Sequence, residues 1–313
     1  MDLNYDLIIV GAGPAGMTAG VFAARKGLKT AIVSKDLGGQ VNWTTDIENY
    51  MGFQEIDGPA LMKKFETQVQ ELHLDQKLIP VRAIAREGEG FRVKTESGEE
   101  LRGRAVLVCS GKRPRTLDVP GEVEFRNKGV SYCATCDGPL FKNKAVAVVG
   151  GGNSALKSAL DLANYATEIH LVSLTPLTAD AVLVERLNGN SKVKQHLEHT
   201  VVEVRGGPIV DRILLEAVRS KQRFEIPVSG VFIEIGLEPN VDFLGDLVAR
   251  NEAGEVKIDC YCRTDVPGLY AAGDVSSVPE KQIIIAAGEG AKAAIIAWED
   301  LLRTREPALA GSV

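Results

Sequence analysis

Two cysteines separated by two residues are the part of this sequence best suited to chemistry. They are Cys133 and Cys136, and Asp137 follows directly. A Cys-x-x-Cys pair can alternate between dithiol and disulfide, and that exchange needs a group that gives and takes a proton. Gly138 and Pro139 come next, which predicts that a helix begins at the pair and favours a thiolate there. The pattern predicts a redox-active pair, with catalytic roles for Cys133, Cys136 and Asp137.

The same two cysteines could instead be half of a zinc site or two small buried apolar side chains. Zinc would need a second pair of ligands, for which the sequence offers Cys260 and Cys262. One intervening residue on a predicted strand is an unusual spacing for zinc, and it places both thiols on one face, as core packing does. We therefore favour the redox interpretation and expect no bound metal.

Other metal-like residues carry weaker signals. His196 and His199 have no third ligand nearby in the sequence, and we interpret their segment as a solvated strand edge or loop. His170 has no recognisable partner, and Cys109 is expected to be a buried apolar residue.

A glycine-rich turn at residues 11–16 (Gly-Ala-Gly-Pro-Ala-Gly) follows an apolar run at 5–10 and precedes a helical pattern. In such a turn the first glycine permits the bend, the second lets backbone approach a pyrophosphate, and the third allows close helix packing. N–H groups at the helix start then face the phosphates. The predicted dinucleotide-binding residues here are Gly11, Gly13, Pro14, Ala15 and Gly16. The usual acidic ribose ligand is missing from residues 34–36, where Asp36 or backbone groups would have to replace it.

A second turn of this kind lies at residues 150–155 (Gly-Gly-Gly-Asn-Ser-Ala), after an apolar run at 144–149. Its predicted nucleotide-binding residues are Gly150, Gly152, Asn153, Ser154 and Ala155. The next strand ends at Ser173, a weak ribose ligand, and no arginine follows before Arg186. An NADPH site needs arginine for the 2′-phosphate, so the pattern argues against NADPH without identifying NADH.

Two late segments suggest further ligand contacts. An apolar strand at 268–272 ends in Gly273 and Asp274, which could turn a carboxylate and backbone N–H groups toward a chain of hydroxyls. Lys281, Gln282 and Ile283 then lead into a helix of small residues at 286–302, whose first N–H groups could stabilise negative charge on a reduced flavin. The alternative is a strand, loop and helix that close the sheet without touching a ligand.

These motifs must be positioned by two βαβ units, at 5–33 and 144–172, which predict two nucleotide-binding domains. Segments 91–108 and 201–235 have patterns that predict antiparallel strands, each segment ending in a strand of the central sheet. Crossings at 112–121 and 239–245 make the second domain an insertion into the first. We expect an α/β fold with two Rossmann-like dinucleotide-binding domains, one formed by 1–116 and 243–313 and the other, inserted into it, by 117–242. The tail after Leu302 is expected to fray.

Composition limits the remaining classes. The 313 residues carry 42 acidic and 36 basic side chains, well mixed, with a net charge of −6, so no basic surface for nucleic acid is expected. The sequence has no apolar run of about eighteen residues, and its first residues look like a strand rather than a signal peptide. We therefore expect no membrane association and a cytoplasmic location, where a close cysteine pair is more often catalytic than structural.

Taken together, these residues resemble the low-molecular-weight thioredoxin reductases over nearly the whole chain. The matching segments are 11–16, Gly38-Gly39-Gln40, Asp46-Ile47-Glu48-Asn49-Tyr50, 133–138, 150–155 and 271–275. The ending at 281–294 is closer to the flavoprotein subunit of alkyl hydroperoxide reductase, whose N-terminal thioredoxin-like extension we do not expect in this protein. The chain would therefore pass its electrons to a separate protein.

The resemblance implies a homodimer with non-covalent FAD in the domain formed by 1–116 and 243–313 and a nicotinamide nucleotide in the domain 117–242. It implies that a hydride passes from the nicotinamide to FAD and that the reduced flavin then attacks a Cys133–Cys136 disulfide. It implies that Cys136 faces the flavin, that Cys133 attacks the partner disulfide, and that Asp137 is the acid/base. It also implies rotation of the inserted domain between the two steps. The FAD residues carried over by resemblance are Gly38, Gly39, Gln40, Asn49, Gly111, Gly273, Asp274, Lys281, Gln282 and Ile283.

The donor is where the chain departs from the family. NADPH-dependent members have a His-Arg-Arg type cluster where this chain has Leu171-Val172-Ser173-Leu174. We expect a thioredoxin-disulfide reductase of the pyridine nucleotide-disulfide type that uses NADH rather than NADPH and reduces a thioredoxin-like protein. The alternatives are a ferredoxin-dependent reductase, a reductase of a peroxiredoxin system, and a non-enzymatic flavin protein whose dithiol senses redox state.

Overall fold

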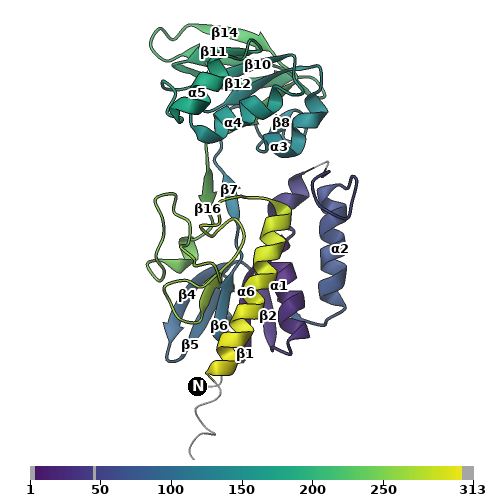
Figure 1. Ribbon diagram of the computed structural model, residues 1–313, viewed down its shortest axis with the longest axis vertical. Coiled ribbons are helices and arrows are strands. Elements are labelled where there is room, and N and C mark those ends of the chain that lie inside the picture. The colour runs from purple at the N-terminus through teal and green to yellow at the C-terminus, as the bar shows by residue number, and fades with distance from the viewer. Residues whose placement is uncertain (1–3, 45–46, 305–313) are drawn as a thin grey trace, which may run out of the picture. The chain divides into compact units, whose positions relative to one another are not determined.

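The computed structural model describes residues 4–44 and 47–304, arranged as two compact units (Figure 1). Unit 1 contains the chain up to Trp43, Tyr50–Arg113 and the chain from Glu238 onward, and unit 2 contains Thr44–Asn49 and Pro114–Leu237. The sequence-based boundaries, at 116/117 and 242/243, lie a few residues further along the chain. Asp46 of the resemblance motif and the tail beyond 304 lie outside the described residues.

Unit 1 is built on a seven-stranded sheet of order β3-β2-β1-β6-β5-β4, with β17 also paired to β6. Strands β1, β2, β3, β6 and β17 are parallel, whereas β4 and β5 extend the sheet in antiparallel fashion. The strands are β1 (Tyr5–Ala12), β2 (Thr30–Leu37), β3 (Asp75–Lys77), β4 (Val81–Glu87), β5 (Gly90–Thr95), β6 (Glu100–Val108) and β17 (Leu269–Ala271). The predicted apolar strand at 5–10 pairs on both sides, with Ile8 opposite Ala31 and Val106.

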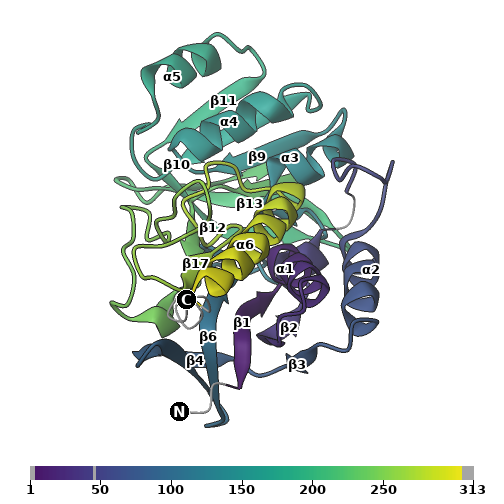
Figure 2. The ribbon, with the colours of Figure 1, turned by 60° about the horizontal axis from the view of Figure 1, so that its bottom comes forward.

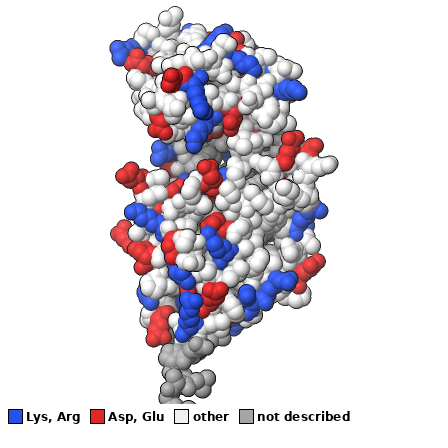
Figure 3. All heavy atoms as spheres, viewed as in Figure 1, with Lys and Arg blue, Asp and Glu red and all other residues white. Residues whose placement is uncertain are grey.

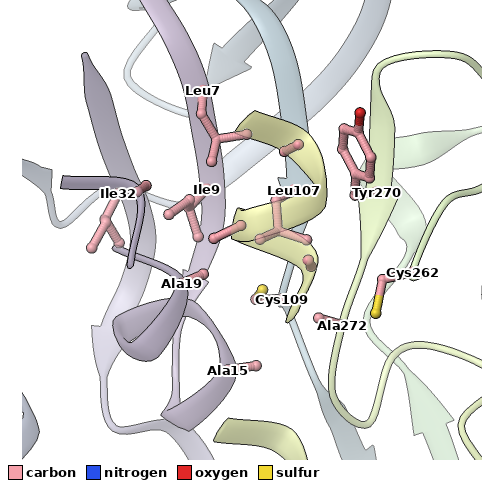
Figure 4. Packing of buried hydrophobic residues seen from close by; sticks show 14 of the residues in the cluster. Leu7, Ile9, Ala15, Ala19, Ile32, Leu107, Cys109, Cys262, Tyr270 and Ala272 are labelled. Atoms are coloured by element: carbon pink, nitrogen blue, oxygen red, sulfur yellow. The ribbon is translucent and has the colours of Figure 1, made fainter. Parts of the chain in front are cut away.

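Helices α1 (Pro14–Arg25) and α6 (Ile283–Arg303) lie side by side on unit 1, and α2 (Gly58–Gln70) packs beside α1 (Figure 2). Small residues allow the close approach, because a Cβ on Gly290 of α6 would collide with the carbonyl oxygen of Ala15 in α1. Leu7, Ile9 and Leu107 of the sheet pack under these helices in one buried cluster (Figure 4). The 3₁₀ segments η1 (Gly39–Trp43) and η3 (Asp242–Leu244) complete unit 1.

Unit 2 is built on a parallel five-stranded sheet of order β11-β10-β9-β15-β8. Its strands are β8 (Val130–Ser131), β9 (Ala145–Val149), β10 (Glu168–Ser173), β11 (Val193–Leu197) and β15 (Gly230–Ile233), and its helices are α3 (Ala134–Asp137), η2 (Gly138–Phe141), α4 (Asn153–Leu162) and α5 (Ala181–Asn188). Residues of α4 pack on one face of this sheet. The other face packs on an antiparallel sheet of β12 (His199–Gly206), β13 (Val210–Ala217) and β14 (Arg223–Pro227).

The two segments that lead into and out of Pro114–Leu237, the main part of unit 2, pair as the short strands β7 (Lys112–Pro114) and β16 (Leu237–Pro239). On the unit 1 side, the Asn240 N–H donates to the Gly111 carbonyl at 3.0 Å. On the unit 2 side, the Arg115 N–H donates to the Gly236 carbonyl, also at 3.0 Å. The predicted fold class, two Rossmann-like domains with the second inserted into the first, is confirmed.

Among the described residues, no helix is long and apolar enough to cross a membrane. Acidic and basic side chains are interspersed on the face that Figure 3 presents. The mixed charge of the sequence is therefore also mixed in space on that face.

Candidate active site: a disulfide and two glycine turns

Cys133 and Cys136 form a disulfide in unit 2, with their Cα atoms 5.3 Å apart. Helix α3 begins directly after Cys133, as the sequence predicts, but it is a single turn that continues into η2. Cys133 is its N-terminal cap, and the Cys136 N–H points at the Cys133 sulfur at 3.2 Å. In the reduced pair, this N–H would stabilise a thiolate on Cys133.

Asp137 is tied to this pair through Ser131, a buried residue at the end of β8. The Ser131 hydroxyl donates to the Asp137 carboxylate at 2.6 Å and accepts from the Cys133 N–H at 3.1 Å. One serine thus fixes both the carboxylate and the backbone of the first cysteine. Sequence reasoning missed Ser131, because a serine two residues before a cysteine carries no recognisable signal.

The turn at residues 11–16 has the geometry that a bound pyrophosphate requires. Gly11 has φ +111°, and a Cβ there would collide with the carbonyl of Cys109. A Cβ on Gly16 would collide with the carbonyl of Gly11, so α1 packs directly on the turn. A Cβ on Gly13 would meet nothing closer than the Gly38 oxygen at 4.0 Å, which leaves the front of the turn open. These residues fit the dinucleotide that the motif predicts.

Several other predicted FAD residues of unit 1 lie around the same turn. The Gly38 N–H donates to the Ala12 carbonyl at 2.8 Å, and Gly39 and Gln40 follow in η1. A Cβ built on Gly273 would lie 3.1 Å from the Ala15 Cβ, so the segment carrying Asp274 also borders the turn. The helix expected at 286–302 begins earlier, which places Ile283 in its first turn and Gln282 at its cap.

Asn49 and Gly111 differ in placement from this group. Asn49 is exposed and lies in Thr44–Asn49, the segment that groups with unit 2. Gly111 has φ +66° and open space where a Cβ would be, and it follows β6. Gly111 is anchored by Asn240, as described for the crossing segments.

Asp274 lies near a cluster of three charged residues, Lys112, Glu255 and Lys281, of which only Lys281 was predicted from the sequence. Glu255 accepts from Lys112 at 2.5 Å and from Lys281 at 3.1 Å, and Lys281 also donates to the Ser276 carbonyl at 2.6 Å. Burial would raise the pKa of Glu255, but hydrogen bonds from Lys112, Asn251 and Lys281 outweigh it and lower the pKa. Burial lowers the pKa of Lys281 and raises that of Asp274, whose nearby lysines oppose the rise.

Lys281, predicted as a flavin contact, is therefore held inside unit 1 by Glu255. Lys112 and Glu255 had no sequence signal, because 143 positions separate them. The cluster joins the segment after β6 to the segments that flank β17. It fixes the approach to α6, where the predicted flavin residues Gln282 and Ile283 lie.

The second turn, at residues 150–155, lies between β9 and α4 in unit 2. A Cβ on Gly150 would collide with the carbonyl of Glu234, which repeats the relation between Gly11 and Cys109. Asn153 exchanges hydrogen bonds with Asp180, accepting from its N–H at 2.8 Å and donating to its carboxylate at 3.0 Å. These residues also fit a dinucleotide turn.

Ser173 packs under this turn. It is 3% exposed, and its hydroxyl occupies the space that a Cβ on Gly151 would need. In unit 1, Ser34 holds the equivalent place and accepts from the Ala12 N–H at 3.1 Å. A contact between Ser173 and a ribose stays a prediction.

Glu234, directly after β15, was not recognised from the sequence. Its carboxylate accepts hydrogen bonds from the hydroxyls of Ser154 and Ser158, the latter at 2.7 Å. Ser154 was predicted as a nucleotide ligand by its place in the motif, but its partner lies 80 residues away.

The remaining cysteines do not form the predicted arrangement of two thiols on one face. Residues 260–262 form a turn rather than a strand, with Cys262 at φ +63°. Cys260 is exposed, while Cys262 is buried and its thiol donates to the Glu289 carboxylate at 3.0 Å. Within residues 4–44 and 47–304, no group of three or more His, Cys, Asp or Glu side chains is arranged to hold a metal ion. Cys109 is buried, as expected, and burial raises its pKa.

The prediction of a solvated strand edge at His196 and His199 was only partly right, because β11 is the edge strand of its sheet but both rings are partly buried. His196 lies 3.0 Å from His170 between ring nitrogens, and its ring packs against those of His199 and Phe224. His170 is only 6% exposed and is 2.7 Å from Glu168. Burial is the largest cause that lowers the pKa of His170, and with the neighbouring histidines it lowers the pKa of His196 to about 4.

A family model, several relatives and several solved structures are similar to this chain. A family model described as pyridine nucleotide-disulphide oxidoreductase matches residues 5–291. An alkyl hydroperoxide reductase subunit of Pseudomonas putida is 41% identical over 97% of this chain and 59% of its own length. A protein of Bacillus subtilis named NADH dehydrogenase is 39% identical, over 96% and 59%. The chain thus spans about three fifths of the length of these relatives.

Among solved structures, thioredoxin reductase from Streptococcus pyogenes is similar with a TM-score of 0.91 and 36% identity. The match covers 97% of this chain and 100% of that one. Thioredoxin reductase from Giardia duodenalis is similar with a TM-score of 0.89 and 30% identity, over 95% and 99% of the two chains.

Proposed function

This chain belongs to the pyridine nucleotide-disulphide oxidoreductase family, and on that premise we propose that it is an FAD-dependent thioredoxin-disulfide reductase. The observation that carries the proposal is the Cys133–Cys136 disulfide, with Asp137 fixed beside it by Ser131. The family implies FAD and a nicotinamide cofactor. A disulfide in the unit of the second turn supports electron flow from those cofactors to a protein disulfide.

FAD would be held by the first turn, residues 11–16, and by the segments around it at 38–40, 273–274 and 281–283. When bound, FAD would accept a hydride from the nicotinamide and supply two electrons to the disulfide. The open front of Gly13 leaves room for a pyrophosphate, and the N–H groups at the start of α1 favour its charge. The Lys112–Glu255–Lys281 cluster orients the loop before α6.

The residues of unit 2 would carry the disulfide chemistry. Two electrons and two protons break the Cys133–Cys136 bond and leave two thiols, with Asp137 as the group that gives and takes a proton. The Cys133 thiolate, stabilised by the Cys136 N–H, attacks the partner disulfide and forms a mixed disulfide. Cys136 then attacks the Cys133 sulfur, which releases the reduced partner and restores the internal disulfide.

NADH is the proposed donor. No arginine follows β10 before Arg186, so the chain lacks the usual ligands for a 2′-phosphate. The names of its relatives support two partner classes, a thioredoxin and the peroxiredoxin that an alkyl hydroperoxide reductase serves. We propose a separate thioredoxin-like protein as partner, a homodimer as the assembly, and a turning of unit 2 between the two half-reactions.

Ferredoxin is the second candidate donor, because Ser173 is a poor ribose ligand and lies buried. Anaerobic mixing separates these candidates. We expect NADH to bleach the oxidised flavin faster than NADPH, whereas bleaching by reduced ferredoxin alone would overturn the nicotinamide assignment.

The dithiol mechanism is tested by Cys136→Ser. This variant should bind FAD and accept electrons but reduce no thioredoxin-like protein, while the control Cys260→Ala should keep full activity. Activity retained by Cys136→Ser would contradict the mechanism. Flavin reduction without turnover on any disulfide protein by the unaltered chain would instead support a redox sensor.

A further inference from the structure

The two glycine turns of this chain can be compared position by position. Gly11 abuts the Cys109 carbonyl in unit 1, and Gly150 abuts the Glu234 carbonyl in unit 2. The registers agree, since Val10 pairs with Val108 and Val149 pairs with Ile233. Cys109 and Glu234 therefore occupy equivalent places, each directly after the strand that flanks its turn.

Three equivalent positions have changed together between the units. In unit 1, Cys109 packs with Ala15 and Ala19 of α1 in the buried cluster (Figure 4). Counting from the first glycine of each turn, the corresponding residues of α4 are Ser154 and Ser158. In unit 2 these two hydroxyls both donate to the Glu234 carboxylate.

The result is a carboxylate fixed beside the first turns of α4. Ser158 is 8% exposed and holds Oε1 from the buried side, while Ser154 is exposed and holds Oε2 at the surface. A carboxylate oxygen can accept more than one hydrogen bond, so both oxygens keep capacity for a ligand. The apolar packing of Cys109 in unit 1 thus corresponds to a hydrogen-bonded carboxylate, that of Glu234, in unit 2.

The sheet order indicates which half of a dinucleotide would meet this charge. In unit 2, β10 lies on one side of β9 and β15 on the other. A dinucleotide lies across the carboxyl ends of the strands at such a point, with its adenosine ribose at the end of the second strand of the βαβ unit, here β10. Glu234, at the end of β15, is therefore on the nicotinamide side.

We propose that Glu234 is a recognition residue for the charged nicotinamide ring and that Ser154 and Ser158 position it. When the donor gives up a hydride, with its two electrons, to the flavin, the neutral dihydronicotinamide becomes a positively charged pyridinium. A fixed carboxylate stabilises that charge and so favours hydride release. This inference rests on the proposed function, because it requires a nicotinamide nucleotide in unit 2.

The test compares two ligands that cannot react with the oxidised holoenzyme: NAD⁺, with a charged ring, and 1,4,5,6-tetrahydro-NAD, with a neutral one. Titration calorimetry gives both dissociation constants. Glu234→Gln should weaken NAD⁺ about tenfold and change tetrahydro-NAD less than about twofold, since only the charge–charge interaction is lost. Added salt should reduce the effect of Glu234→Gln on the dissociation constant of NAD⁺, because salt screens the charge–charge interaction. Glu225→Gln, in β14, is the matched control and should change neither constant.

The outcomes separate this inference from the proposed function. If the unaltered protein binds neither ligand, the nicotinamide donor and this inference both fail. If it binds both but Glu234→Gln leaves their ratio unchanged, only the inference fails. Should Glu234→Gln not fold, the Ser154→Ala/Ser158→Ala double variant provides the same test, with a smaller loss for NAD⁺ expected and an unchanged ratio contradicting it.

Discussion

Ser131 shows how a single side chain can organise a disulfide site. Its hydroxyl hydrogen goes to the Asp137 carboxylate at 2.6 Å, and its oxygen accepts the Cys133 N–H at 3.1 Å. The carboxylate therefore cannot move independently of the first cysteine. Proton transfer is sensitive to such positioning, because a general acid or base must lie within hydrogen-bond reach of its target.

At this scale we predict that Asp137→Asn lowers the rate of thioredoxin reduction about 100-fold or more, since general acid–base catalysis contributes that much. Ser131→Ala should cost about tenfold, because the carboxylate remains but is no longer held. Stopped-flow absorbance of flavin reoxidation measures both. Asp161→Asn, an exposed acid on α4, is the control. Equal rates for Asp137→Asn and this control would exclude Asp137 from the proton transfer.

Individual residues also show the limits of sequence reasoning. The glycine turn at 11–16 could be predicted because its spacing is a local motif, and the atom that excludes a side chain at Gly16, the Gly11 carbonyl, belongs to the same turn. Glu234 and Glu255 could not be predicted this way. Ser158 lies 76 positions from Glu234 and Lys112 lies 143 positions from Glu255, and no local pattern specifies which strand ends will meet.

Among the elements, the parallel strands were the most predictable, since runs such as 145–149 are buried on both faces and read as continuous apolar segments. The neighbourhood of β11 was not predictable. Its polar pattern suggests solvent, yet His196 faces His170 of β10 and packs against His199 at the start of β12. Strand pairing brings the three histidines together, with Glu168 and Lys194 as the charged neighbours.

This cluster predicts that unit 2 loses stability in mild acid. His196 is neutral when folded, with a pKa of about 4, whereas an unfolded histidine has a pKa of about 6.5. The unfolded chain thus binds more protons between these values, so stability is full above about pH 6.5 and declines as the pH falls toward 4. The loss should be on the order of 1 kcal/mol, discounted because His196 is only partly buried.

Thermal unfolding measured between pH 7.5 and 5 checks this sign. His196→Gln should flatten the pH dependence, and His73→Gln, at an exposed site in unit 1, should leave it unchanged. If His196→Gln loses as much stability in acid as the unaltered protein, groups other than His196 control that loss.

For the whole molecule, the division into two units separates the proposed ligand sites. The FAD residues, apart from Asn49, belong to unit 1, whereas the disulfide and the second turn belong to unit 2. Each unit has buried clusters of its own on both faces of its sheet. A ligand that binds one unit should therefore stabilise mainly that unit.

We predict that removing FAD increases amide hydrogen exchange in α1, in η1 and at the start of α6. The antiparallel sheet of β12, β13 and β14 should keep its protection, because it contributes no predicted FAD residue. Exchange detected by mass spectrometry on the holoprotein and apoprotein measures this. A comparable increase in β12–β14 would show that the units unfold as one and would contradict the separation.

The pairing of β7 with β16 has an evolutionary consequence. Because the strands at the two ends of Pro114–Leu237 pair with each other, this segment is an insertion whose ends meet at one point of the surrounding chain, the geometry in which domain insertions are tolerated. On the proposed function, replacing residues 114–237 by the corresponding segment of an NADPH-using relative would exchange donor preference and disulfide together. The flavin-binding host would keep its own sequence, so lineages could acquire new electron sources by recombination at two sites.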